Sequence, residues 1–421
     1  MPARDLPVRP DLDQLKHQAK DLLRALHEGD ADAVADLRAF HPDPFDPAIA
    51  KLADAQLTLA RSYGAPSWPR LVQSCQLTDA IWRNDLAAVR ALALKNPKLL
   101  QENALVENRN WGPPMSYAAN LGHDAMIRML HDLGATDHVY ALGRAMLQSK
   151  IDTSRLLYGL MSAPRLPNDA LDGPAYTLSV VGTAFAFEHG ARAVDAEGRR
   201  LAPVATVLET DGRNPAAKHE ILALYELHGV RLPDTPTMAV HRGRIDLLEQ
   251  HLRRDPGLLS RVFSHEEIYP PELGCHDEVL ATHGTPLNGA TLLHMAVDYD
   301  EMEIARWLLD HGLHVDARAA VDADGFGGHT ALFGTVVSQP NFWMNRQGRP
   351  QVAPFAALLL DLGANPNARA SLRKQLHPGY GHEVMHEFRD VTPLSWGERF
   401  HRKVFVSAPA MRLIAKHGGH S

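Results

Sequence analysis

Apolar side chains recur every three or four positions along most of this 421-residue chain, a spacing that predicts many short helices. In the N-terminal part the pattern predicts helices at 11–27, 31–40, 51–63 and 68–74, separated by Gly, Pro and Asp. We therefore expect residues 1–75 to form a small helical capping module. Such a module would cover the apolar face of the segment that follows, and a role in recruiting a partner is the alternative.

From residue 77 onward the pattern changes to pairs of short helices. Many second helices end in a step with Gly, which adopts the left-handed conformation that stops a helix without a Cβ penalty. These steps lie at 132–135, 188–191, 227–230, 310–313, 361–364 and 416–419. First helices begin with Pro or Thr followed by small apolar residues, as at Pro114, Thr291, Thr330 and Thr392. Together the two signals predict helix pairs over residues 76–421.

The chain also repeats itself. Residues 80–100 (AIWRNDLAAVRALALKNPKLL) align without a gap on residues 239–259 (AVHRGRIDLLEQHLRRDPGLL). Similarity at this scale is typical of a solenoid, in which each unit buries its apolar face against its neighbours. The next equivalent apolar position lies 15 residues after Leu100 but 33 after Leu259, so the second copy contains an insert.

These openings and endings resemble those of the ankyrin repeat, as found in bacterial-type ankyrin repeat proteins. The best matches are residues 291–316 (TLLHMAVDYDEMEIARWLLDHGLHVD) and 358–367 (LLLDLGANPN). The resemblance covers residues 77–419 and is weakest at 142–234, where the opening motif is missing. It implies an all-α ankyrin-repeat solenoid of stacked helix-turn-helix units with β-turn fingers. It also implies binding of another protein through the concave face and the fingers.

Composition narrows the function classes. A formal net charge of −7 disfavours binding to nucleic acid or to an anionic membrane surface, and no apolar run is long enough to cross a bilayer. The first 15 residues lack the apolar stretch of a signal peptide. Only two cysteines are present, at positions 75 and 275, which suits a reducing compartment. We therefore expect a cytoplasmic protein.

Three connections between helices are unusually long, at residues 261–289, 316–330 and 368–392. In a stack each of them joins one repeat to the next, so all three should emerge side by side at one edge. They are rich in His, Asp and Glu, and 15 of the 24 histidines lie from His241 onward. Because long loops in a compact fold are often functional, we expect the functional surface in the C-terminal half.

Binding candidates on and near these fingers are His265, Glu266, His283, Phe342 and Trp343. His265, Glu266 and His283 supply polar groups within the first finger. Phe342 and Trp343 lie in a Pro-bounded polar segment, where exposed aromatic side chains would anchor a partner.

A catalytic alternative uses the same fingers. His276, Asp324 and His329 could converge as an acid/base set, as in a hydrolase or a lyase. In that case the ligand would be a small molecule instead of a protein.

No cofactor is expected, although a divalent metal is an open possibility with His276, His329, His382 and His386 as candidate ligands. His382 and His386 form an H-E-x-x-H pentad, which binds zinc when it lies on a helix. Because Pro and Gly precede the pentad and no long apolar helix surrounds it, a metalloprotease is disfavoured. The interaction scaffold is therefore the preferred interpretation, and the enzyme or ligand-binding protein is the alternative.

Overall fold

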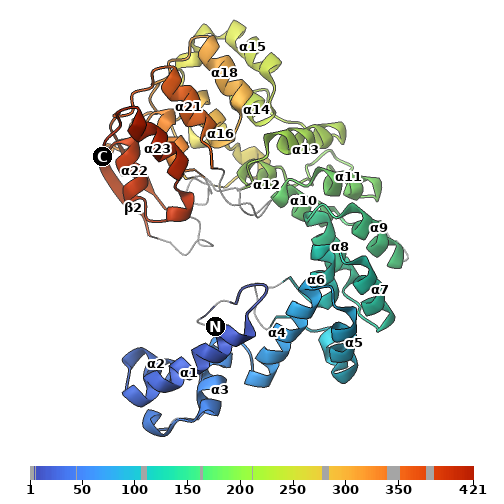
Figure 1. Ribbon diagram of the computed structural model, residues 1–421. Helices are drawn as coiled ribbons and strands as arrows, with labels where there is room; N and C mark the ends of the chain where they lie inside the picture. Colours follow the sequence, from blue (N-terminus) through green and yellow to red (C-terminus); the bar gives the residue numbers. More distant parts are fainter. Residues whose placement is uncertain are drawn as a thin grey trace. The chain divides into compact units, whose positions relative to one another are not determined.

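The computed structural model describes residues 4, 6–43, 45–105, 111–161, 165–210, 212–276, 284–338, 351–375 and 384–421. The chain is mostly helical and divides into two compact units, residues 1–165 and 166–421 (Figure 1). Among the helices of these residues, none combines the length and the apolar character needed to span a bilayer.

The first unit begins with a helical module. Its helices are α1 (Leu12–Glu28), α2 (Ala31–Phe40), α3 (Leu52–Ser62) and α4 (Trp68–Trp82). Leu15, Leu26, Leu59 and Leu71 belong to one hydrophobic cluster whose members all lie between residues 6 and 75. The apolar spacing at 11–27 therefore identified the face of α1 that is buried.

α4 runs through position 75 without a break. Ser67 caps its N-terminus, and no Gly or Pro interrupts the chain between Pro69 and Arg83. Its buried side chains include Leu71 as well as Leu77 and Ile81, so one helix serves both the N-terminal module and the first helix pair. The helix expected at 68–74 is thus longer than its sequence pattern suggested.

The rest of the first unit consists of helix pairs. The further helices are α5 (Leu86–Lys95), α6 (Pro114–Leu121), α7 (Asp124–Asp132), α8 (His138–Leu147) and α9 (Ile151–Leu160). Each first helix packs against its own second helix and also against the first helix of the next pair, so that α4, α6 and α8 form one row. This packing is that of a solenoid.

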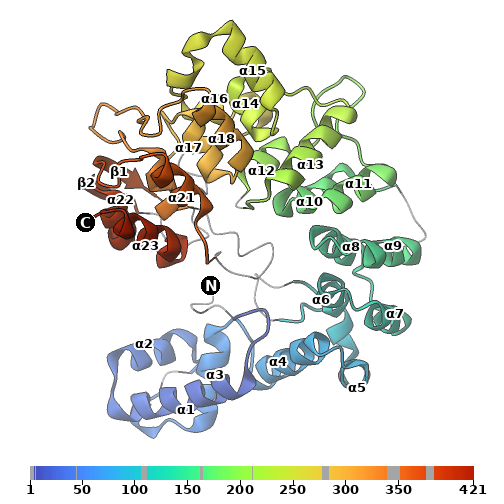
Figure 2. The same ribbon diagram turned by 45° about the horizontal axis from the view of Figure 1, so that its top comes forward.

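The second unit continues the same scheme (Figure 2). Its helices are α10 (Asp172–Thr177), α11 (Val180–Glu188), α12 (Val204–Glu209), α13 (Pro215–Leu227), α14 (Pro236–His241), α15 (Ile245–Arg254), α16 (His265–Ile268), α17 (Leu292–Asp298), α18 (Met302–Asp310), α19 (Ala331–Val336), α21 (Pro354–Asp361), α22 (Pro393–Arg399) and α23 (Ala408–Lys416). Here α14, α17, α19 and α22 form the row of first helices, each packed against the next.

The internal duplication corresponds to equivalent structure. α5 is followed by a 3-10 helix at Pro97–Leu100, and α15 is followed by one at Pro256–Ser260. The predicted helix ends are also present, because Gly134, Gly190, Gly229, Gly312, Gly363 and Gly418 all have positive φ.

One short sheet interrupts the helical pattern. β1 (Ala370–Lys374) and β2 (His386–Val391) are antiparallel, with Leu372 opposite Phe388, and β2 packs against α22 (Figure 2). The sheet lies within the connection at 368–392, so this finger is a β-ribbon and not a simple turn. His386 is the first residue of β2. The helix that an H-E-x-x-H zinc site requires is therefore absent at its second histidine.

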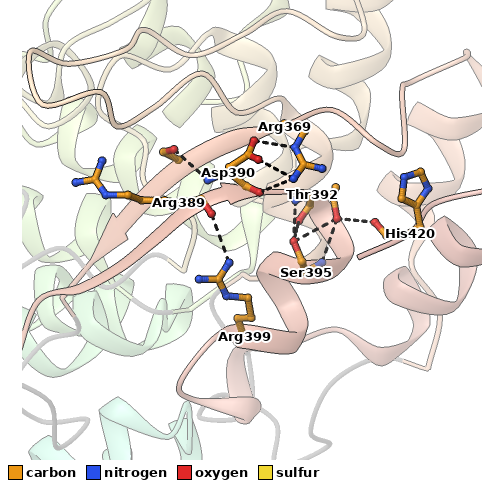
Figure 3. A network of polar contacts seen from close by, with 8 residues as sticks. Arg369, Arg389, Asp390, Thr392, Ser395, Arg399 and His420 are labelled. Carbon is orange, nitrogen blue, oxygen red and sulfur yellow. Dashed lines mark hydrogen bonds and ion pairs between the residues drawn. The ribbon is translucent and has the colours of Figure 1, made fainter.

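Polar contacts hold the end of this ribbon against the last helix pair (Figure 3). Arg369 binds the Asp390 carboxylate through two bonds of 2.7 Å, and the Thr392 hydroxyl donates to the carbonyl of His420 at 2.7 Å. Thr392 and Ser395 form the capping box of α22. The chain leaving β2 is thus fixed at the start of the final repeat.

Candidate binding grooves on the finger rim

The three long connections are joined by backbone hydrogen bonds, and we call the edge that they form the finger rim. The amide of Ala320 in the second connection donates to the carbonyl of Gly289 in the first at 2.8 Å. The amide of Gly327 donates to the carbonyl of Ser371 in the third at 2.6 Å. The described parts of the three fingers therefore lie side by side, as stacking of the repeats predicts.

Gly327 shows how tightly the second finger is folded. Its φ is +120°, and a Cβ at this position would lie 1.9 Å from the backbone oxygen of Ala320. The glycine therefore permits both the conformation and the backbone contact.

A groove of about 470 Å³ opens between the fingers, and we call it the central groove. Buried Phe263, Phe326 and Leu372 contribute one from each finger, while Val262 and Val321 are exposed at its mouth. The other lining residues are Ser264, Glu267, Pro286, Asn288, Gly289, Ala320, Asp322, Gly327, His329 and Arg373. An apolar floor with polar groups at the edges is the usual composition of a binding site.

Two arginines flank the aromatic floor of the central groove. The guanidinium groups of Arg373 and Arg389 lie 5.0 Å and 4.3 Å from the ring centre of Phe326. Arg373 also forms ion pairs of 2.7 Å with Asp322 and 2.8 Å with Asp324. These contacts connect the β-ribbon to the second finger.

A second groove, of about 420 Å³, adjoins the first and shares Phe263 and Glu267 with it. Its lining comprises Asp234, Thr235, Pro236, Thr237, His251, Arg254, Asp255, Leu258, Arg261, Phe263, Glu266, Glu267, Pro270 and Glu272. Five carboxylates face two guanidinium groups, a formal charge of −3 when His251 is neutral. We call it the acidic groove.

His329 lies on the rim as predicted, but its ring is engaged in the fold. It is 1% exposed, and its Nε2 bonds to the carbonyl of Pro286 at 3.0 Å. His294 in turn bonds to the carbonyl of His329 at 3.1 Å and to the Thr291 hydroxyl at 2.8 Å. Burial lowers the pKa of His329 to about 3 and that of His294 to about 4, so both rings are neutral at pH 7.

The three candidates for an acid/base set have different partners. His276 bonds through Nδ1 to Glu209 of α12 at 2.7 Å, whereas Asp324 pairs with Arg373. His329 is tied to the Pro286 carbonyl. These contacts support a structural role for each of the three side chains.

The binding candidates of the first finger are placed around α16. His265 is buried and bonds to the carbonyl of His276 at 3.0 Å, whereas Glu266 is exposed in the acidic groove. His283, Phe342, Trp343 and His382 lie outside the described residues. Within the described ranges, no three His, Cys, Asp or Glu side chains are close enough together to hold a metal ion.

A buried charged cluster was missed from the sequence. Arg213, which precedes α13, pairs with Asp298 at the end of α17, and both side chains are almost fully buried. Lys218 of α13 lies 3.3 Å from His241 Nδ1 and 3.8 Å from the ring centre of Tyr299. Desolvation lowers the pKa of Lys218 to about 8 and that of His241 well below its usual value.

One sequence signal could have identified part of this cluster. The segments Met-Ala-Val-His241 and Met-Ala-Val-Asp298 end the equivalent helices α14 and α17. A polar residue that follows the same apolar triplet in two equivalent helices indicates a buried polar position, because the stack repeats its burial pattern.

One segment of the chain, which forms a helix pair, matches a known protein family. Residues 288–320, which include α17 and α18, match the sequence profile of the ankyrin repeat. The chain therefore contains an ankyrin repeat where the sequence resemblance is strongest. Among curated proteins, none matches this sequence at a significant level.

Solved structures that match this chain include two ankyrin repeat domains. One is the ankyrin repeat domain of Bcl-3, a member of the IkappaB protein family, with 15% identity, a TM-score of 0.21 and coverage of 81% of this chain and 97% of that chain. The other is the human ASB11 ankyrin repeat domain, with 15% identity, a TM-score of 0.21 and coverage of 82% and 98%.

Proposed function

We propose that this protein is a protein-binding module whose partner binds at the finger rim. The central groove carries this proposal, because all three fingers contribute to one site of about 470 Å³ with an apolar floor. Ankyrin repeats are generally interaction modules, and loops on a rigid stack are a common location for binding residues. Val262 and Val321 at the mouth offer apolar side chains to a partner.

The remaining features fit such a module. Residues 1–75 are its N-terminal cap in this proposal. The support for this role is that these residues have a hydrophobic cluster of their own and that α1 and α3 pack against α4, the first helix of the row. The proposed compartment is the cytoplasm, since Cys75 and Cys275 are free thiols. Among the described finger residues, His265, His329 and Asp322 form hydrogen bonds within the finger rim.

Site-specific photo-crosslinking tests the proposal. A benzoyl-phenylalanine replacing Val321, which is 62% exposed at the groove mouth, should form a discrete adduct with one partner protein in cells. The control places the same group at Leu94 in α5, which is 64% exposed. No adduct at position 321, or the same adducts from both positions, would contradict the proposal.

A further inference from the structure

The acidic groove and the central groove form one continuous surface, since Phe263 and Glu267 line both. We propose that this surface binds an extended segment of the partner in which cationic and apolar side chains alternate. The inference rests on the proposed function and adds the chemical class of the partner segment.

The negative charge of the acidic groove favours a positively charged side chain of the partner. Some of its carboxylates are already compensated: Asp234 pairs with Arg254 at 3.2 Å, and Glu267 pairs with Arg261. Glu266 and Glu272 are different, because both are exposed and neither has an ion pair within the described residues. These two carboxylates are therefore available to an incoming Lys or Arg.

The neighbouring cation does not remove this charge. Arg200 donates to the backbone carbonyl of Glu272 at 2.6 Å. Arg261 is held by Glu267 and stacks over the ring of Phe263, with 4.8 Å between the guanidinium carbon and the ring centre. The carbonyl that Arg200 binds is neutral, so the positive charge of Arg200 offsets part of the negative potential near Glu272, whereas Arg261 is already offset by Glu267. With Arg200 included, five carboxylates face three guanidinium groups, and the groove keeps a formal charge of −2 when His251 is neutral.

The apolar part of the surface explains why a simple polycation is not the preferred ligand. Leu258 and Phe263 form the floor on the acidic side, and Phe326 with Leu372 continues it on the central side. Burying apolar side chains against this floor provides affinity, while contacts with Glu266 and Glu272 provide orientation and specificity. An extended segment suits the site because its successive side chains point to opposite sides, one toward the floor and one toward the rim.

Fluorescence anisotropy with the full-length protein tests this proposal. The probe is a labelled, end-capped decapeptide of alternating Lys and Val, and the comparison peptides alternate Glu with Val and Lys with Ser. We expect the Lys–Val peptide to bind most tightly and its affinity to fall as salt increases. Equal binding of the Lys–Ser peptide, or tighter binding of the Glu–Val peptide, would overturn the proposal.

A matched pair of variants locates the binding. The double substitution Glu266→Gln/Glu272→Gln should weaken Lys–Val peptide binding by about tenfold, because it removes two uncompensated charges at exposed positions. The control Glu303→Gln/Asp310→Gln, at exposed positions on α18, should leave the affinity unchanged. Unchanged binding by the first variant would overturn the proposal.

The two proposals fail in different ways. If crosslinking at position 321 captures one partner but the Lys–Val peptide does not bind, the protein-binding function stands and the cationic-segment inference fails. If no adduct forms at position 321, the proposed function itself fails, whatever the peptides do.

Discussion

Arg213 and Asp298 form a 3.0 Å ion pair between side chains that lie 85 positions apart in sequence and are almost fully buried. Arg213 also donates to the carbonyls of Asp298 at 2.7 Å and Thr210 at 2.8 Å, and it stacks 4.9 Å from the ring centre of Tyr299. A planar guanidinium suits this role because its donors are fixed in direction. The pair connects the segment before α13 to the end of α17.

Arg213→Ala should lower the free energy of unfolding by about 3–5 kcal/mol, because it leaves the Asp298 carboxylate buried without its cation. The double variant Arg213→Met/Asp298→Met should lose less, since it removes both charges and keeps most of the volume. Urea denaturation of the full chain measures both values. The control is Arg155→Ala, whose exposed pair with Asp152 should contribute little.

Lys218 should make stability depend on pH in the alkaline range. Its pKa is about 8 in the fold against a usual 10.5, because burial disfavours the ammonium form. Between these values the unfolded chain binds more protons than the folded one, so the contribution of Lys218 to stability rises with pH. Relative to wild type, Lys218→Met should be more stable at pH 7 by ~3 kcal/mol from this effect alone, with the difference shrinking toward pH 10.5.

Urea unfolding of both proteins at pH 7, 8, 9 and 10 measures the difference. Comparing the two proteins at each pH removes the titration of groups that they share. A constant difference over this range would show that the buried amine does not titrate as its surroundings imply.

Much of the fold could be predicted from the sequence because its determinants are local. The glycines at helix ends and the capping threonines, such as Thr291 and Thr392, act through bonds a few residues away. The first helices form a row because the same local signals recur in successive repeats, which then stack on one another. α4 is the informative exception, since nothing local ends a helix at position 75.

The site could be predicted less well, because its chemistry depends on partners far apart in sequence. His276 is paired with Glu209, 67 positions away, and Asp324 with Arg373, 49 positions away. The sequence shows that His, Asp and Glu are frequent in the fingers. It does not show which of these side chains already pair with other residues of the chain. The sequence predicted where a binding surface would lie, on the three fingers. It could not predict the volumes of the grooves, because these depend on how the three fingers pack.

His294 and His329 should make the protein sensitive to acid. Their pKa values are about 4 and about 3 in the fold, because burial disfavours the charged imidazolium. As pH falls from about 6.5, both rings become protonated in the unfolded state but stay neutral in the folded state. The free energy of unfolding therefore falls by up to ~1.4 kcal/mol per pH unit for each ring. His329→Gln should remove one of these two contributions.

The measurement for this prediction is the slope of unfolding free energy against pH between 6.5 and 4.5. His329→Gln is expected to be less stable than wild type at pH 7, since the contact with the Pro286 carbonyl changes. Its slope should nevertheless be smaller. An unchanged slope would mean that His329 takes up its proton as readily in the folded state as in the unfolded state.

Gly327→Ala should disrupt the finger rim more than any other glycine change in the second finger. The new methyl group would lie 1.9 Å from the Ala320 carbonyl oxygen, and this oxygen belongs to the backbone, so it cannot rotate away as a side chain could. Gly325→Ala is the matched control, because its φ is also positive, at +84°, but open space surrounds it. The control should lose about 1–2 kcal/mol from backbone strain, and Gly327→Ala should lose clearly more.

Hydrogen exchange separates a local effect on the rim from general destabilisation. The amides of Ala320 and Gly327 donate to the neighbouring fingers, so their protection reports on the contacts between fingers. In Gly327→Ala both amides should exchange faster than in Gly325→Ala, while the amides of α18 keep their protection. Equal exchange in the two variants would show that close packing at Gly327 does not hold the fingers together. In that case the central groove would not depend on this contact.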